Sequence, residues 1–397
     1  MLRVLTLSTL FPNAAQPTFG VFVERQTLGL AALPGVELQV VAPVGLPLWP
    51  LSRHPHYAER ARLPLRETWK GLVVHRPRFG VVPRLGEART ARSMAAALLP
   101  LLRDLQSDFP FDVIDAQFFW PDGPAAKILS DALGLPFSVK ARGGDINHWG
   151  TRPAVAPQLV EAGQAAGGLL AVSGALAGVM ASLGLPDDRI KVHYTGVDFG
   201  RFIPVDRAAA KAALGVEGPL IVSAGALIPR KGQRLAIDAL RQIPGATLLI
   251  VGQGPERRRL EAHAAAAGVA GRVRFLGNRP HDELPGLLAA ADVMVLPSAS
   301  EGLANVWVEA LACGTPIVIG DVGGAREVLT RPEAGRLPPL EAEAIAAAVR
   351  ELLADPPAQA DVRRVVERFS WDTNSRTLYD HLAAVAAGGG RALRPAA

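Results

Sequence analysis

The sequence predicts an α/β fold made of two doubly wound, Rossmann-like domains. Uninterrupted runs of valine, isoleucine and leucine alternate with segments of helical periodicity along most of the chain. Strands that lack an apolar–polar alternation are typical of parallel sheets that helices cover on both faces. At 397 residues the chain is also too long for a single core and suits two domains.

The first domain is predicted over residues 1–198. Its strand-like segments are 4–8, 36–41, 113–116, 137–140 and 168–172. Its helical segments are 21–33, 94–105, 122–133 and 157–164. Parallel sheets of this kind bind ligands beyond the carboxyl ends of their strands, so the loops after these strands are the first places to look for a site.

The interval 44–92 departs from this alternation. It contains Trp49, Trp69, Phe79 and several prolines. Its basic residues are Arg53, Arg60, Arg62, Arg66, Lys70, Arg76, Arg78, Arg84, Arg89 and Arg92. One interpretation is a solvated connection with a few helical turns. The other is a basic, aromatic lip that lies on an anionic membrane surface or holds an acidic acceptor. The sequence leaves both interpretations open.

The domain junction is expected where turn-forming and aromatic residues gather, at 193–202. The second domain then covers 199–370, with strands at 220–224, 247–251, 273–276, 293–296 and 317–319. Its helices are expected at 233–242, 256–267, 282–290, 304–313 and 342–353. An amphipathic helix is predicted at 371–387 and a disordered tail at 388–397. A cleft between two such domains is a natural ligand site.

Composition and charge exclude several classes of protein. The single cysteine, Cys313, permits no internal disulfide and fits a reducing cytoplasm. The apolar run at the N-terminus is short, which favours a first strand over a signal peptide. Glycines interrupt the apolar run at 167–185, which disfavours a membrane span. The net charge of +5 comes from scattered arginines without a nucleic-acid-binding signature, so no nucleic-acid partner is expected.

Two loops of the second domain carry candidate anion-binding groups. Gly252-Gln-Gly-Pro255 follows a strand and opens a helix, where backbone amides can face an anion, although such a turn is more often structural. It lacks the third glycine and the acidic residue of a dinucleotide site, which disfavours hydride chemistry. Arg230 and Lys231 follow the first strand of the domain and form a candidate diphosphate clamp, the alternative being an exposed helix-starting pair.

The stretch 298–316 contains only two acidic residues, Glu301 and Glu309, among small, apolar and amide side chains. A buried carboxylate must be paired, hydrogen-bonded or directed at a polar ligand. The predicted helix N-terminus, whose free N–H groups favour a negative ligand, consists of Gly302, Leu303, Ala304 and Asn305. Eight residues correspond to about 800° of an ideal helix, so we expect both carboxylates to border one groove.

The spacing of these two glutamates resembles a known family signature. Glu301-Gly-Leu-Ala-Asn-Val-Trp-Val-Glu309, followed by Ala-Leu-Ala-Cys-Gly-Thr-Pro316, is similar to the motif of the retaining, family-four glycosyltransferases of GT-B architecture. Further similar segments are 172–173, 196–198, 227–232, 251–255, 275–277 and 281–284. Phe11-Pro-Asn13, the segment 19–24 and Arg142-Gly-Gly-Asp145 look closest to the teichuronic-acid-type branch, which builds bacterial surface polysaccharides. The resemblance spans almost the whole chain.

This resemblance implies a function. The chain would move a sugar, with retention of configuration, from a nucleotide-diphosphate sugar to a lipid-linked or polysaccharide acceptor. A UDP-sugar is favoured as donor, and GDP-mannose stays open. The two domains would face a cleft, and the helix at 371–387 would cross back to the first domain. The enzyme would need no metal and no cofactor, and it would work in the cytoplasm, with the inner face of the membrane as a possible docking surface.

The resemblance also implies roles for individual residues. Glu301 would contact hydroxyls of the donor sugar, Glu309 the ribose and Lys231 the diphosphate, while the helix tip at 302–305 would hold the phosphates. Gly20 would let the first loop approach the diphosphate, and Asp145 would lie near the sugar. The catalytic set is therefore Glu301, Asp145 and Lys231. The remaining donor-binding candidates are Arg142, Arg230 and Gly252.

Two departures from the family pattern concern the same site. Ala226 stands where the family usually has an arginine, and Arg230 is a candidate substitute. Arg142 stands where many relatives carry a histidine, and its permanent charge argues against an acid–base role and for binding a phosphate or an acidic sugar. The alternative function is a non-catalytic, two-domain protein that binds a sugar or a nucleotide sugar. A GT-B epimerase or phosphorylase would require other site residues.

Overall fold

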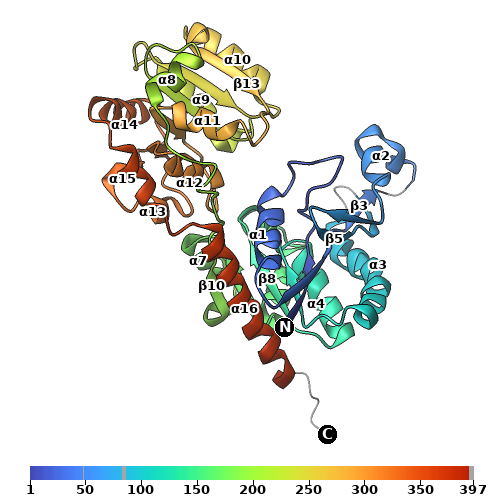
Figure 1. Cartoon of the computed structure of the whole chain (residues 1–397). Helices are drawn as coiled ribbons and strands as arrows, with labels where there is room; N and C mark the ends of the chain where they lie inside the picture. The colour runs from blue at the N-terminus through green and yellow to red at the C-terminus, as the bar shows by residue number, and fades with distance from the viewer. Residues whose placement is uncertain (48, 83–85, 393–397) are drawn as a thin grey trace. The chain divides into compact units, whose positions relative to one another are not determined.

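The computed structural model describes residues 1–47, 49–82 and 86–392. The chain divides into two compact units (Figure 1). Unit 1 comprises Met1–Gly196 together with the C-terminal segment from Trp371, and unit 2 comprises Val197–Ser370. The predicted boundary at residue 198 lies close to this division.

Unit 1 is built on an eight-stranded sheet with the order β10-β9-β8-β7-β1-β2-β5-β4. Its strands are β1 (Leu2–Leu7), β2 (Val36–Val41), β4 (Arg66–Trp69), β5 (Leu72–His75), β7 (Val113–Ala116), β8 (Phe137–Ala141), β9 (Gly168–Ala171) and β10 (Ile190–Val192). All neighbouring strands pair in parallel except β4, which is antiparallel to β5. The chain winds outward in both directions from the adjacent strands β1 and β7, which are in register from Val4 with Val113 to Leu7 with Ala116.

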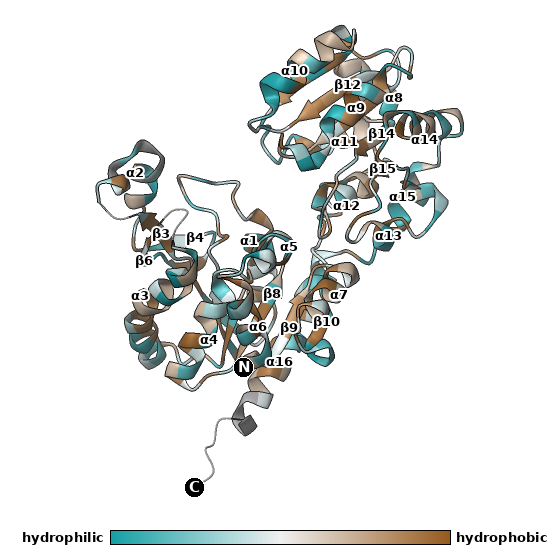
Figure 2. Cartoon of the chain, turned by 180° about the vertical axis from the view of Figure 1, so that it is seen from behind, coloured by the Kyte–Doolittle hydropathy of each residue, from teal (hydrophilic) through white to brown (hydrophobic). Residues whose placement is uncertain are grey.

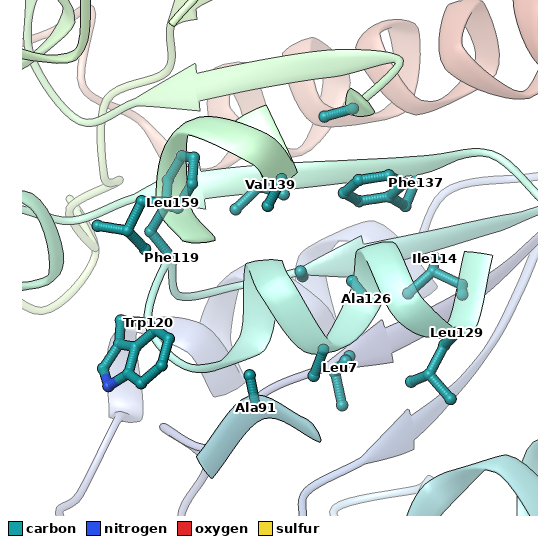
Figure 3. Close-up of a cluster of buried hydrophobic side chains, with 14 of the residues drawn as sticks. Leu7, Ala91, Ile114, Phe119, Trp120, Ala126, Leu129, Phe137, Val139 and Leu159 are labelled. Carbon is teal, nitrogen blue, oxygen red and sulfur yellow. The ribbon is translucent and has the colours of Figure 1, made fainter. Parts of the chain in front are cut away.

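Helices cover both faces of this sheet. One face carries α3 (Glu87–Asp108), α4 (Asp122–Leu133) and α6 (Ala156–Ala165), whose apolar side chains pack on Leu7, Ile114 and Val139 (Figure 3). The other face carries α1 (Val21–Ala31) and α16 (Trp371–Ala392), which pack against each other over Val4, Val113 and Leu170. The helix predicted at 371–387 thus continues to Ala392, and the prediction of a disordered tail is wrong for 388–392. Residues 393–397 lie outside the described residues.

The interval 44–92 is folded, which corrects the interpretation of a solvated connection. Strands β3 (Val44–Pro47) and β6 (Arg78–Val81) form a small parallel pair, and the hairpin β4–β5 extends the main sheet. Between them lie the 3-10 turn Leu51–Arg53 and helix α2 (Pro55–Ala61). Arginines in and beside short strands concealed the pattern. Arg76, directly after β5, pairs with Glu67 and donates to the carbonyl of Pro12, and Arg78 in β6 donates to the carbonyls of Leu63 and Arg76. Arg84 lies outside the described residues.

Unit 2 is built on a six-stranded, fully parallel sheet with the order β13-β12-β11-β14-β15-β16. Its strands are β11 (Leu220–Ala224), β12 (Thr247–Val251), β13 (Val273–Gly277), β14 (Val293–Leu296), β15 (Ile317–Ile319) and β16 (Gly335–Arg336). In sequence terms the order is 3-2-1-4-5-6, the arrangement of a doubly wound Rossmann fold. The strands of unit 2 that the sequence predicts are all confirmed, since each is an apolar run that ends at a glycine, proline or polar residue.

Two helical layers cover the sheet of unit 2. Helices α9 (Gln233–Leu240), α10 (Arg257–Ala266) and α14 (Ala342–Ala354) pack on one face around Ile221, Leu248 and Val295. Helices α8 (Arg207–Ala213), α11 (Leu284–Ala290), α12 (Asn305–Ala312) and α15 (Gln359–Arg364) pack against one another in the second layer. Figure 2 shows hydrophobic strands at the centre of each unit and a largely hydrophilic α10. Within the described part of the chain, no helix combines the length and apolarity needed to cross a bilayer.

Candidate functional site

The candidate site of unit 2 lies where the winding of its sheet reverses. Strands β11 and β14 are neighbours, but the chain leaves β11 toward β12 and leaves β14 toward β15. In doubly wound sheets the loops that follow such a pair of strands diverge and open a crevice for ligands. Lys231 lies in the loop after β11, and Glu301 lies in the loop after β14. The structure therefore brings together two residues that are seventy positions apart, and Lys231 Nζ donates a hydrogen bond to Glu301 Oε1.

Backbone contacts hold these two loops against each other. Gly232 adopts a left-handed φ of 73° at the start of α9, and a Cβ atom there would lie 2.1 Å from the carbonyl oxygen of Pro297. Only glycine tolerates both this conformation and this approach. The amide of Ala299 donates to the carbonyl of Arg230 at 2.8 Å. The cationic loop and the acidic loop are therefore fixed relative to each other before a ligand binds.

Two cations hold the carboxylate of Glu301. Lys231 Nζ lies 2.5 Å from Glu301 Oε1, and Arg230 Nη1 lies 3.5 Å from Oε2. The side chains of Glu301 and Lys231 are 8% and 14% exposed, whereas that of Arg230 is 51% exposed and also donates to the carbonyl of Ser300. The cluster carries one net positive charge. It can orient a carboxylate toward a ligand and also attract an anion.

The loop that carries Glu301 leads into α12. The helix begins at Asn305, and its N-cap residue Ala304 supplies no side-chain hydrogen bond. The amide of Trp307 donates to the carbonyl of Ala304 at 3.0 Å, so the N–H groups of Asn305 and Val306 are left for a ligand or solvent. The carbonyl of Gly302 accepts a hydrogen bond of 2.7 Å from Gly324, which ties this loop to the turn after β15. Because residues 301–304 are not helical, the rotation angle that the sequence suggested between Glu301 and Glu309 does not apply.

Glu309 lies in the second turn of α12 and is paired with a histidine. Its Oε1 is 3.2 Å from His281 Nε2, and its side chain is 12% exposed. The ring of His281 packs edge-on against Phe202, and its buried Nδ1 has no partner among the described residues. The family resemblance included His281, but sequence reasoning gave it no role. Its pairing with Glu309 is a feature that only the structure reveals.

Gly252 and Ala226 lie in the neighbouring loops of the same sheet edge. The amide of Gly252 donates to the carbonyl of Gly277 at 2.8 Å, and a Cβ atom at Gly252 would lie 2.0 Å from the carbonyl oxygen of Gly225. This close backbone contact is sufficient to explain why residue 252 is a glycine, whether or not a ligand binds there. Anion binding at Gly252 therefore stays a prediction. The carbonyl of Ala226 accepts a hydrogen bond from the side chain of Gln233.

Unit 1 has an equivalent reversal between β1 and β7. The loop after β1 is tied to the start of α4, because Thr9 donates to Asp122 through its amide at 3.0 Å and its hydroxyl at 2.8 Å. Gly20 caps α1 with a φ of 76°, and a Cβ atom there would lie 2.3 Å from the carbonyl oxygen of Leu10. The glycine predicted to admit a diphosphate is therefore already required by the turn itself.

Asp145 does not face an open site. It is fully buried, and its carboxylate accepts hydrogen bonds from the backbone amides of Phe119, Arg142 and Gly143. Burial raises the pKa of this carboxyl, and the three backbone donors oppose the shift. The oxygens of Asp145 are occupied in holding the loop after β8, and the expectation that Asp145 lies near the sugar stays a prediction. Asp145 is a positioning residue for that loop.

Arg142 is held by a single glutamine. Its Nε donates to the carbonyl of Gln117 at 2.7 Å, its Nη2 donates to the side-chain oxygen of the same residue, and its guanidinium lies 4.8 Å from the Phe22 ring centre. Burial lowers the pKa of Arg142 to about 10, so the group keeps its charge at neutral pH. This rigid cation at the sheet edge fits an anion-binding role and excludes an acid–base role at that pH.

A buried polar network beneath this edge was missed by sequence reasoning. Lys140, in the middle of β8, donates to Gln26 and to His193 Nδ1, each at 2.8 Å. His193 Nε2 contacts the carbonyl of Asn374 in α16 at 2.9 Å, so Nε2 carries the hydrogen and Nδ1 accepts from Lys140. Burial lowers the pKa of Lys140 and of His193 well below their usual values. The available signal was a lysine inside a short strand that otherwise contains only uncharged residues.

Two buried aspartates border the same network. Burial raises the pKa of Asp115 to about 6 and that of Asp122 to about 7. Neither belongs to a metal-binding group, because no cluster of three histidine, cysteine, aspartate or glutamate side chains occurs within 1–47, 49–82 and 86–392. The hydrogen bonds of the network connect β8, α1 and α16 within unit 1.

Family models match both parts of the chain. Residues 20–201 match the model described as Glycosyltransferase Family 4, and residues 205–368 match the model described as Glycosyl transferases group 1. The two matches follow each other along the chain. The chain therefore belongs to the family-four glycosyltransferases with the GT-B fold.

Curated relatives and solved structures agree with this family. TuaC of Bacillus subtilis (strain 168), whose name places it in teichuronic acid biosynthesis, is 28% identical over 95% of this chain and 97% of its own. A GDP-mannose-dependent phosphatidylinositol monomannoside mannosyltransferase of Mycolicibacterium smegmatis is 36% identical, over 47% of this chain and 54% of its own. Thus the chain spans about half the length of this second relative.

Among solved structures, a sucrose-phosphate synthase from Thermosynechococcus elongatus superposes with a TM-score of 0.81 at 22% identity, over 98% of this chain and all of that one. HepE of Anabaena, solved in complex with UDP, gives a TM-score of 0.72 at 22% identity, over 97% of this chain and all of its own. At these identities the likeness shows the fold alone.

Proposed function

We propose that this glycosyltransferase moves a sugar, with retention of configuration, from a nucleotide-diphosphate sugar to a lipid-linked or polysaccharide acceptor during synthesis of a cell-surface glycan. The observation that carries the proposal is the cluster of Lys231, Arg230 and Glu301 at the sheet reversal of unit 2, next to the first turn of α12. This cluster combines the two features that sugar transfer from a diphosphate needs.

The first feature is stabilisation of the leaving group. When the bond between the sugar and the diphosphate breaks, negative charge develops on the diphosphate oxygen. Lys231, Arg230 and the N–H groups of α12 are donors that are already in place for such charge, and a preorganised group loses little energy to rearrangement during the reaction. We infer that these groups replace a metal ion, so that transfer proceeds in the presence of a chelator. The proton of the acceptor hydroxyl passes to the departing diphosphate oxygen on the same face of the sugar.

The second feature is an oriented carboxylate. Glu301 is held by two cations, so its oxygens have fixed directions and can accept hydrogen bonds from hydroxyls of the donor sugar. In the ligand-free chain Lys231 is paired with Glu301, and a bound diphosphate would supply it with a second anionic partner. We propose no covalent role for Glu301.

The donor is proposed to be a UDP-sugar, with GDP-mannose as the alternative. HepE has been solved with UDP and with UDP-glucose, while the mycobacterial relative is GDP-mannose-dependent by name. A thermal-shift and calorimetric comparison of UDP, GDP and ADP tests the proposal. Saturable binding of one of these diphosphates supports it, and the absence of binding by all three would contradict it.

Replacing Glu309 by glutamine is expected to weaken binding of the preferred diphosphate by about 10- to 100-fold, because a charged hydrogen bond to a ribose hydroxyl would be lost. Calorimetry on the variant measures this change. Glu343→Gln, an exposed position on α14, is the matched control and should bind as the wild type does. A nucleoside diphosphate that lacks the 2′- or the 3′-hydroxyl of its ribose should bind the Glu309 variant almost as tightly as the parent diphosphate binds it. If both deoxy analogues lose as much affinity in the variant as in the wild type, the ribose assignment is wrong.

We propose that the enzyme works in the cytoplasm and docks on the inner face of the membrane through the folded interval 44–82. Large apolar side chains are exposed there, with Trp49 73%, Leu51 57% and Leu65 67% accessible. Arg62 and Arg66 are also exposed in this interval. Tryptophan beside arginines is the combination that binds the interface of an anionic bilayer.

The variant Arg62→Glu, Arg66→Glu is expected to reduce binding to vesicles containing phosphatidylglycerol by about 30-fold or more, since each basic residue contributes about 1 kcal/mol at such a surface. Co-sedimentation measures it. The control variant Arg103→Glu, Lys191→Glu reverses two exposed cations elsewhere in unit 1 and should leave binding unchanged. Equal vesicle binding by the wild type and both variants would contradict the proposed docking on the membrane.

A further inference from the structure

Glu309 is the acidic residue of α12 that we propose to contact the ribose of the donor. Its side chain is 12% exposed, so most of its carboxylate is removed from water. Cys313, one turn further along the helix, has the same surroundings, since burial and the charge of Glu309 raise the pKa of its thiol to about 12. A carboxylate in such a place needs a hydrogen-bond donor that stabilises its charge.

His281 supplies that donor from the turn between β13 and α11. Its Nε2 lies 3.2 Å from Glu309 Oε1, and no other described residue bonds to this carboxylate. Oε1 therefore has a protein partner, whereas Oε2 is left to a ligand or to water. A carboxylate that is held through one oxygen has the other oxygen fixed in direction as well.

The ring of His281 is itself held in one orientation. It packs edge-on against the fully buried ring of Phe202, with ring centres 5.6 Å apart and an angle of 81° between the ring planes. The backbone is held as well, because the carbonyl of His281 accepts a hydrogen bond from Arg201, which also pairs with Asp282. The donor that Glu309 meets is therefore preorganised.

The buried Nδ1 atom of His281 identifies the hydrogen that the ring donates. Nδ1 has no hydrogen-bond partner among the described residues. A hydrogen on Nδ1 would be a buried donor without an acceptor, and in the neutral ring it would leave Nε2 and Glu309 Oε1 as two acceptors facing each other. The neutral ring therefore carries its hydrogen on Nε2 and donates it to Glu309, so the carboxylate keeps its negative charge.

We propose that His281 is a positioning residue for donor binding, which holds Glu309 through Oε1 and thereby directs Oε2 at a hydroxyl of the donor ribose. This inference rests on the proposed function, because it explains how the residue assigned to the ribose is oriented. His281 acts through Glu309 and makes no contact of its own with the donor.

The test is calorimetry on the full chain with the diphosphate that the wild type binds, UDP or GDP, and with the forms of that diphosphate that lack the 2′- or the 3′-hydroxyl. His281→Leu and His281→Asn both remove the hydrogen bond, because leucine has no donor and the asparagine side chain is too short to reach Glu309. Both variants should bind the parent diphosphate about 10-fold more weakly than the wild type does, and at least one deoxy form with wild-type affinity. His281→Gln should stay within about 3-fold of the wild type, because the glutamine amide nitrogen takes the place of Nε2.

A second histidine–carboxylate pair in unit 2 provides the matched control. His263 Nε2 lies 2.6 Å from Asp238 Oδ1 and connects α10 to α9. His263→Leu removes this pair and should leave all affinities unchanged. In the Glu309→Gln background, His281→Leu should cause little further loss, since the group that it positions is already altered.

Unchanged binding in both His281→Leu and His281→Asn would overturn the inference. An equal loss for the parent diphosphate and both deoxy forms would overturn it too, because that pattern shows general damage to the site. A variant that folds incompletely lowers the number of binding sites and not the ratio of these affinities. If Glu309→Gln alone lost affinity, the ribose contact would stand and the role of His281 would be wrong. If the wild type bound no diphosphate, the proposed function would fail together with this inference.

Discussion

Glu301→Ala is expected to reduce the rate constant for sugar transfer by about 100- to 1,000-fold or more, the effect typical of removing one preorganised electrostatic group from an active site. The substitution removes the acceptor that fixes the sugar hydroxyls, and it also removes the partner of Lys231. The expected effect on nucleotide binding has the opposite sign. Without the competing carboxylate, Lys231 and Arg230 can both turn to the phosphates, so the diphosphate should bind as tightly as in the wild type or more tightly.

A transfer assay with calorimetry of the same samples measures both quantities. Glu301→Gln keeps the size of the side chain and separates the loss of charge from the loss of volume. Glu343→Gln serves again as the control carboxylate that is remote from the site. Wild-type turnover in Glu301→Ala would contradict the assignment, and so would a loss of diphosphate affinity that matches the loss of rate.

Lys231→Ala is expected to raise the dissociation constant of the diphosphate by about 10- to 150-fold, corresponding to the 1.5–3 kcal/mol of a hydrogen bond to a charged group. The rate constant should fall as well, because the same cation stabilises the leaving group. The structure adds that Glu301 would then retain only Arg230, which is 3.5 Å away and half exposed. The remaining carboxylate would repel the diphosphate.

The control for this variant is Arg234→Ala, an exposed cation three positions further along the chain in α9. The double variant Lys231→Ala, Glu301→Ala measures the coupling of the pair. Its diphosphate affinity should lie above that of Lys231→Ala alone, since the repelling carboxylate is absent. Additive effects of the two substitutions would show that the ion pair has no part in donor binding.

The fold was largely predictable from the sequence because buried parallel strands are continuous apolar runs. The strand 247–251, Thr-Leu-Leu-Ile-Val, and the strand 317–319 were predicted with the bounds that the structure has. The helix expected at 94–105 begins seven residues earlier, at Glu87, where charged residues hide the apolar stripe. The strands of the interval 44–82 were not predicted, because local sequence does not show that Arg76 pairs with Glu67 and donates to the carbonyl of the distant Pro12.

The candidate site was predictable in part for a related reason. Lys231 and Glu301 each followed a predicted strand, so both could be placed at the edge of the sheet. That they are neighbours became clear only from the strand order, in which β11 and β14 are adjacent. The pairing of Glu309 with His281 and the burial of Asp145 could not be read from local sequence, since both depend on which loops meet.

The buried network of unit 1 shows a further limit. Lys140 was a visible anomaly within β8, but its partners lie 114 positions away at Gln26 and 53 positions away at His193. Hydrophobic periodicity indicates which residues are buried. It does not indicate which distant groups form the hydrogen bonds that a buried polar residue needs.

We propose that transfer from a nucleotide-diphosphate sugar depends on the cationic cluster of unit 2 and not on a metal ion. The most direct measurement follows released UDP or GDP and the glycoside product together, in the presence of a chelator, for the wild type, Lys231→Ala and Arg234→Ala. We expect one diphosphate released per glycoside formed and a rate that the chelator does not lower. The rate should fall about 10-fold or more in Lys231→Ala and stay unchanged in Arg234→Ala. Saturable binding without any product under all conditions would contradict the proposal and would identify the chain as a binding protein instead.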